Sequence, residues 1–313
     1  MAFDWPTAEE LLYRAMRLRR VILCGLMLPL LSVILLSFGE PPALVAERAG
    51  LAALGMTLLI TGHAVLFPNA TLETLALSCA SSALILVMPV IRAVASLAPA
   101  EHATAALILL LAFAVVLAGV LMALLQIVLG WIVYAGPVVS LRLRTVADVP
   151  CSPSVAHRQC ALQPGIRRGR LMTGIADEDG MFEVAIAAPH LIDPDAPELP
   201  QIVKVTAKVM NSTPERHDVM LILPNGSVTV TSLAFAATTA GCRITVSDLP
   251  GDFTLGMHLL FWLTDQQADN LTEMTDVILG NEARANGLAH GVSLLWVAGA
   301  ILSPRGEVAG QHD

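Results

Sequence analysis

Four long apolar stretches dominate the first half of the chain. They cover residues 21–38, 51–67, 75–91 and 105–134. A helix needs roughly 20 apolar residues to cross the hydrocarbon core of a bilayer. The first three stretches lie at or slightly under that length, and the fourth exceeds it. The pattern therefore predicts a membrane region of about four helical spans over residues 21–138.

Basic residues flank this region at both ends. Six arginines lie close to the outermost apolar stretches: Arg14, Arg17, Arg19, Arg20, Arg142 and Arg144. Segments on the cytoplasmic side of a membrane are enriched in Lys and Arg. We therefore expect a multi-pass protein of a bacterial inner membrane, with its N-terminus and its C-terminal domain in the cytoplasm. An even number of spans agrees with this orientation.

Residues 1–20 predict a short amphipathic helix ahead of the first span. Thr7 and Glu10 have the spacing of a capping box, in which each side chain satisfies the other's backbone amide. Leu12 and Met16 share one side of that helix, and Trp5 suits the headgroup layer. We expect a cytoplasmic, interfacial helix here. A cleaved signal peptide is disfavoured, because no small-residue cleavage site follows the apolar stretch.

Polar side chains are rare in the apolar stretches. Those that could mark a transport path are His63, Arg92 and Gln126. Ionisable groups inside a membrane are costly and usually functional. His63 and Arg92 lie near the ends of their stretches, however, where they can reach the interface. We interpret the four helices as an anchor whose partner is the lipid bilayer.

Composition separates the two halves of the chain. Of 313 residues, 55% are hydrophobic and only 14% are charged, against about a quarter charged in a soluble domain. The formal net charge of −8 excludes a nucleic-acid partner, which would need clustered Lys and Arg. The five cysteines are scattered and lack metal-ligand spacing, so the pattern favours a reducing compartment without disulfides.

From about residue 140 the apolar positions alternate, as in strands with one buried face. The Asn225-Gly226 pair between two such runs is a strong hairpin signal. The alternation predicts an antiparallel meander of five or six strands. One long helix over residues 255–279 follows, and Gly280 ends it. Its acidic side, which includes Asp265 and Asp269, is expected to be solvated.

This order of elements resembles the helix-grip fold of the START-like, or SRPBCC, superfamily over residues of about 140–280. The stretch 177–180 entering the second strand and the turn Ala240-Gly241-Cys242-Arg243-Ile244-Thr245 are similar to motifs of that family. The resemblance implies a cytoplasmic α+β domain, an antiparallel sheet held by a long C-terminal helix. It also implies a cavity for a lipid or other small hydrophobic ligand. Unlike the family, residues 153–171 hold no aromatic side chain.

An apolar cavity between helix and sheet would be lined by large apolar residues. The candidates are Phe182, Met220, Phe235, Phe261, Trp262 and Met274. Alternatively, the same residues fill a solid core. No catalytic residue, metal ligand set or cofactor motif is visible, and His190, His217 and His258 are interpreted as solvated.

The resulting hypothesis is a membrane-tethered domain that binds or presents a hydrophobic ligand without catalysis. Two alternatives stay open: a scaffold or assembly factor for a membrane-protein partner, and a membrane-bound enzyme of the cyclase or hydrolase type. The predicted domains are an N-terminal helix over 1–20, the spans over 21–138, the START-like domain over 139–280, and an apolar helix and tail over 281–313. Whether residues 287–302 form a fifth span is left open, because that stretch is short for a membrane helix.

Overall fold

The computed structural model describes residues 5–39, 41–99, 101–168, 171–192, 200–280 and 293. The chain divides into two compact units. Among the described residues, a helical unit begins at Leu18 and continues to Trp131, and a sheet unit combines the N-terminal helix with residues 132–280. The predicted segment 281–313, and with it the question of a fifth span, lies outside the described residues except for Ser293.

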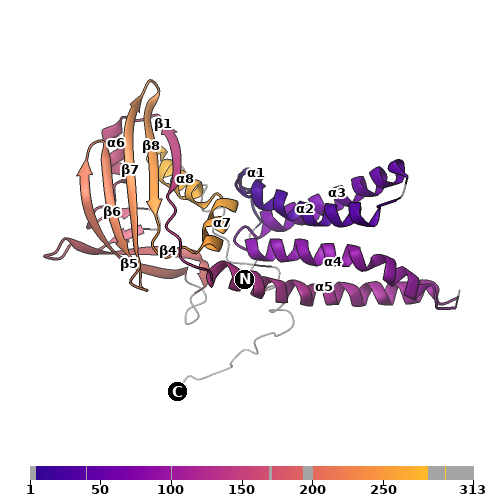
Figure 1. Cartoon of the computed structure of the whole chain (residues 1–313). Helices are drawn as coiled ribbons and strands as arrows, with labels where there is room; N and C mark the ends of the chain where they lie inside the picture. The colour runs from indigo at the N-terminus through magenta and orange to yellow at the C-terminus, as the bar shows by residue number, and fades with distance from the viewer. Residues whose placement is uncertain are drawn as a thin grey trace, which may run out of the picture. The chain divides into compact units, whose positions relative to one another are not determined.

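Four long apolar helices form the helical unit (Figure 1). They are α2 (Arg19–Leu36), α3 (Pro42–Leu66), α4 (Thr71–Ala95) and α5 (Ala103–Tyr134). Each is long and apolar enough to cross a membrane. The predicted four-helix organisation is therefore confirmed among the described residues.

Small and hydroxyl side chains bring these helices together. Ala76 and Ala80 of α4 pack with Met122 of α5 in one buried cluster. The Ser78 hydroxyl of α4 donates a hydrogen bond to the backbone carbonyl of Gly25 in α2. Small residues let helix backbones approach closely in lipid, where no hydrophobic force drives helices together. Many large apolar side chains of the unit, such as Leu109 and Leu124, are exposed on its outside.

The sheet unit is built on one antiparallel sheet of eight strands (Figure 1). The strands are β1 (Leu143–Val149), β2 (Arg167–Arg168), β3 (Leu171–Thr173), β4 (Met181–Ile192), β5 (Pro200–Thr213), β6 (Arg216–Ile222), β7 (Val228–Thr238) and β8 (Gly241–Leu249). Their order in the sheet is β1-β8-β7-β6-β5-β4-β3-β2. The predicted meander is confirmed, but the sheet has more strands than the five or six predicted, because β2 and β3 are only two and three residues long and too short to show alternation.

Four helices accompany the sheet: α1 (Ala8–Arg17), α6 (Pro153–Cys160), α7 (Leu255–Leu263) and α8 (Gln266–Leu279). The predicted single helix over 255–279 is wrong. It breaks after Thr264 because Asp265 adopts a left-handed backbone with φ of 53°. Nothing in the alternation of apolar residues signals this break, since both helices keep apolar residues at helical spacing.

The acidic side of α8 is covered by α1, which corrects the expectation that it is solvated. The Tyr13 hydroxyl donates to the Asp269 carboxylate, and the Arg17 guanidinium donates to the Thr272 hydroxyl. Arg17 also forms an ion pair with Asp265 at 3.5 Å. Burial and the Asp269 carboxylate hold the pKa of the Tyr13 phenol above its usual range. These contacts fasten the N-terminal helix to the last described helix of the chain.

The capping box predicted at the start of α1 is present. The Thr7 amide donates to the Glu10 carboxylate at 2.7 Å, and the Glu10 amide donates to the Thr7 hydroxyl at 3.3 Å. Two backbone amides that a helix start leaves without partners are thereby satisfied.

Candidate functional site

The inner face of the sheet carries two separate apolar clusters. The first joins α6 and α8 to β1, β7 and β8, and includes Phe235, Ile244 and Leu271. The second lies on β4, β5 and β6, and includes Phe182 and Val205. Strand β6 runs along the boundary between them, because its partner residue Leu233 on β7 belongs to the first cluster and its own Val219 belongs to the second.

A β-bulge places a polar group at this boundary. Along β5, Val203, Val205 and Ala207 point to the inner face. The register with β6 shifts between Val209 and Asn211. One extra residue exchanges the two faces of a strand beyond it. Ser212 therefore faces inward, directly across from His217 of β6.

His217 is fully buried, with 0% of its surface exposed, so the expectation that this histidine is solvated is wrong. Its Nε2 lies 3.0 Å from the backbone carbonyl of Leu162, and its Nδ1 lies 3.1 Å from the Ser212 hydroxyl. A carbonyl can only accept, so Nε2 carries the hydrogen, and Nδ1 of the neutral ring then accepts the Ser212 proton. Burial lowers the pKa of His217, which favours this neutral form.

His157 of α6 completes the polar group. Its Nε2 lies 3.3 Å from the Ser212 oxygen, whose remaining lone pairs can accept a hydrogen bond from the ring. The His157 ring meets the Phe235 ring edge to face, with centroids 5.4 Å apart, and the His217 ring with centroids 5.8 Å apart. We call His157, Ser212 and His217 the polar seam. It joins α6, β5 and β6 at the boundary of the two apolar clusters.

A cation lies beside the seam. The Arg168 guanidinium of β2 donates to the Ala161 carbonyl at 3.3 Å, at the end of α6. Burial lowers the pKa of Arg168, and no ion pair to Arg168 occurs among the residues that the structure describes. A cation at the C-terminus of a helix is stabilised by the helix dipole. Arg168 and His217 together hold the end of α6 against the sheet.

The acid sensitivity of the sheet unit follows from His217. In the unfolded chain a histidine takes up a proton below about pH 6.5, whereas burial lowers the pKa of the folded His217. The unfolded state therefore binds more protons in this window, and stability falls as the pH drops below about 6.5. We expect thermal scans of the detergent-solubilised protein to show lower midpoints at about pH 5.5 than at about pH 7.5. His217→Gln should reduce that difference, and the exposed-site control His102→Gln should leave it unchanged.

The six residues predicted to line a cavity occupy different places. Phe182 and Phe235 are buried on the inner face, one in each apolar cluster, and Met274 of α8 packs against the first cluster. Phe261 of α7 lies against Phe253 with ring centroids 5.4 Å apart. Met220 alternates with the inward Val219 and belongs to the outer face, and Trp262 is about half exposed. The inner face thus brings three of the six together, and their contact with a ligand stays a prediction.

Sequence inspection missed the polar seam. Ser212 lies at an odd offset from the inward residues of β5, so alternation alone assigns it to the outer face. The signal that could have indicated the site is the pairing of Ser212 with His217 across the turn between β5 and β6. Without knowledge of the bulge, that pair is indistinguishable from a solvated hairpin end.

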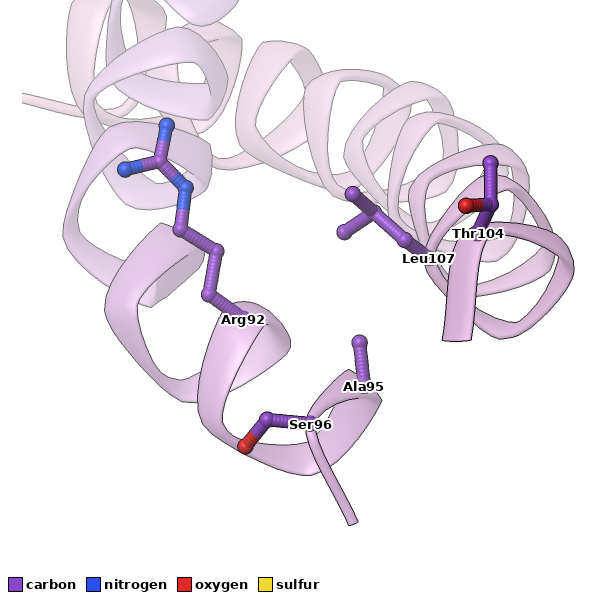
Figure 2. Close-up of a pocket in the computed structure, with 5 residues that line it drawn as sticks. All are labelled: Arg92, Ala95, Ser96, Thr104 and Leu107. Carbon is purple, nitrogen blue, oxygen red and sulfur yellow. The ribbon is translucent and has the colours of Figure 1, made fainter. Parts of the chain in front are cut away.

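The helical unit holds an opening between the end of α4 and the start of α5, shown in Figure 2. It has a volume of about 300 Å³ and is lined by Arg92, Ala95 and Ser96 from the end of α4 and by Thr104 and Leu107 from the start of α5. Arg92 supplies a cation, Ser96 and Thr104 supply hydroxyl groups, and Ala95 and Leu107 are apolar (Figure 2). Arg92 lies in the last turn of α4, and its contact with a membrane interface stays a prediction.

No group of three or more His, Cys, Asp or Glu side chains able to hold a metal ion occurs among the described residues. The buried thiol of Cys160 is unreactive as a nucleophile, because burial raises its pKa to about 12 and keeps it protonated. The side chains that the seam and the adjoining Arg168 offer are imidazole, hydroxyl and guanidinium groups.

Comparisons with known proteins give structural likeness only. No family model matches the chain. No curated protein matches it either. A crystal structure of a protein from Chromobacterium violaceum is 12% identical and covers 44% of this chain and 96% of its own, with a TM-score of 0.33. The crystal structure of Ara h 8.0201 is 12% identical and covers 46% and 100%, with a TM-score of 0.34. A solution structure from Bordetella parapertussis is 14% identical and covers 57% and 94%, also with a TM-score of 0.34.

Proposed function

We propose that this chain is a membrane-anchored binding protein for a small amphipathic molecule with an apolar body and a polar end. The observation that carries the proposal is the inner face of the sheet, where two apolar clusters meet at the polar seam, in which His217 is buried and Ser212 is exposed. Such a face offers an apolar surface for a hydrocarbon body and a few placed polar groups to orient it, as ligand sites do. The order of strands and helices resembles the START-like helix-grip fold, which agrees with this function.

The four apolar helices give the binding domain its location. We place the spans in a cell membrane. The N-terminal segment and the C-terminal domain that flank the spans lie in the cytoplasm, because six arginines lie next to the outermost spans. A tether of this kind raises the effective concentration of a membrane-derived ligand at the domain. A C-terminal reporter active only outside the cytoplasm would contradict this orientation.

The proposal is tested by photocrosslinking. Full-length protein in lipid nanodiscs is exposed to a fatty acid that carries a diazirine, and labelled peptides are identified by mass spectrometry. We expect label on the inner-face strands as well as on the spans. Leu221→Trp fills the inner face beside the second cluster, whereas Ile222→Trp places the same bulk on the outer face. Because overpacking costs about 1–3 kcal/mol, Leu221→Trp should lower strand labelling roughly tenfold and Ile222→Trp should not.

Label on the spans alone would overturn the binding proposal. If the protein then co-purified with a stoichiometric membrane protein, the scaffold function would be favoured. Equal labelling of both tryptophan variants would show that the fatty acid does not occupy the inner face.

One observation favours a second candidate, an acyl-transfer enzyme. The Ser212 hydroxyl donates to a neutral, buried histidine whose other nitrogen is held by a backbone carbonyl. In this reaction the Ser212 oxygen would attack an ester carbonyl, and its proton would pass to His217 Nδ1 and then to the departing alkoxide. Water would release the acid from the serine. Hydrolysis of p-nitrophenyl butyrate that Ser212→Ala abolishes and Thr213→Ala retains would support it, and equal rates in all three proteins would exclude it.

A further inference from the structure

The helix α7 presents an exposed apolar stripe. Leu255, Leu259 and Trp262 follow one another at helical spacing of four and three residues, and each is more than half exposed. Packed positions flank the stripe, because His258 and Leu263 on either side of it are buried. No charged residue occurs within α7. A contiguous apolar patch of this kind on a soluble domain marks a site of contact with another protein or with a membrane.

The start of α7 contacts the last turn of α5. The Thr254 hydroxyl donates to the backbone carbonyl of Val133, one residue before α5 ends. A side chain at Gly256 would meet the backbone of Val133 at 2.5 Å, so the two backbones touch. His258 Nε2 lies 2.7 Å from the Val139 carbonyl. The start of α7 is therefore clamped to the point where the last apolar helix ends.

The N-terminal helix carries a matching stripe. Leu12 and Met16 of α1 are more than half exposed, whereas the neighbouring Tyr13 and Arg17 contact α8. Only one residue separates α1 from α2, the first apolar helix. Arg17 of α1 forms an ion pair with Asp265 at the break between α7 and α8. This ion pair connects the two helices that carry the stripes.

We propose that α1 and α7 together form a seat that lies in the headgroup layer of the bilayer crossed by α2 and α5. The occupant of the two stripes is lipid. Both helices belong to the sheet unit, both adjoin the ends of span-length helices, and Trp262 is a residue type that membrane interfaces favour. Amphipathic helices bury such a stripe about 5–10 Å into the headgroup and acyl boundary. The inference rests on the proposed membrane anchoring.

Quenching by brominated lipids tests the seat in the full chain. Trp5, Trp131, Trp262 and Trp296 are reduced by Phe substitution to one tryptophan at a time, and the proteins are reconstituted into vesicles of phosphatidylcholine brominated near the acyl-chain carbonyls. Trp131 on α5 reports on anchoring, and Trp262 reports on the seat. The control is Met172→Trp in the background lacking all four native tryptophans, because Met172 on β3 is as exposed as Trp262.

We expect about half of the emission of Trp131 and of Trp262 to be lost in brominated vesicles, as for side chains at the interface, and the Met172→Trp emission to be unchanged. Quenched Trp131 with unquenched Trp262 would overturn the seat and leave the anchor standing. Unquenched Trp131 would overturn the anchor itself. Quenching of Met172→Trp to the same extent as Trp262 would show unspecific contact of the whole domain with lipid and would also overturn the seat.

Discussion

Replacing Glu73 by leucine should destabilise the helical unit more than any other single change considered for it. Glu73 lies in the first turn of α4 and has 0% of its surface exposed. Its carboxylate Oε1 lies 2.9 Å from His63 Nε2, and His63 Nδ1 lies 2.9 Å from the Thr74 hydroxyl. Sequence inspection placed His63 at a span end and did not identify its partner across the turn.

The hydrogen bonds of His63 and Glu73 explain why each of the two residues needs the other. The Thr74 hydroxyl donates its proton to the Ala70 carbonyl, so it accepts from His63 Nδ1–H. One proton is then left to share between His63 Nε2 and Glu73, which makes the pair neutral as a whole. A leucine in place of Glu73 would leave Nε2 of the buried, neutral imidazole without that partner, which costs about 1–3 kcal/mol.

The measurement is the thermal midpoint of detergent-solubilised protein. We expect Glu73→Leu to lower it strongly and Glu73→Gln to lower it less, because the amide of the glutamine can still donate to His63 Nε2. The double variant His63→Leu with Glu73→Leu should recover a part of the loss, since an apolar pair replaces the polar one. Glu101→Leu, at an exposed carboxylate, is the control. A midpoint for Glu73→Leu equal to that of the control would contradict the buried pair.

The sequence predicted features that depend on local patterns. The four spans follow from length and apolarity, the hairpin follows from Asn225-Gly226, and the capping box follows from Thr7 and Glu10. Each of these needs only neighbours within a few residues or a continuous apolar run. Local patterns are visible directly in the order of residues, so their prediction succeeded.

The features that were missed depend on contacts distant in sequence or on single backbone angles. The inward position of Ser212 results from one bulged residue, and the break between α7 and α8 results from the positive φ of Asp265. The buried state of Asp269 results from Tyr13, which lies 256 residues earlier. Periodicity carries no information on any of these, and that is why His217 and the acidic side of α8 were both predicted to be solvated.

The turn at Ala240-Gly241, which carried part of the family resemblance, gives the second large effect. Gly241 has a φ of 146°, a conformation that residues with a side chain rarely adopt. A Cβ there would lie 2.2 Å from the Val149 carbonyl oxygen and 2.9 Å from the Cys151 amide nitrogen. Both neighbours are backbone atoms, so no flexible side chain can move aside. Val149 also pairs with Cys242 and thereby joins β1 to β8.

Gly241→Ala should therefore destabilise the sheet unit by more than about 3 kcal/mol, because backbone strain adds to a clash that pulls β1 from β8. Gly180→Ala is the matched control: its φ is 74°, but open space surrounds the added Cβ, so strain alone should cost about 1–2 kcal/mol. Thermal unfolding of the two variants followed by circular dichroism in the β region compares them directly. Similar midpoints would mean that strain explains both and that β1 does not approach Gly241 closely. A much lower midpoint for Gly241→Ala would identify this glycine as the residue that allows β1 to pair with β8.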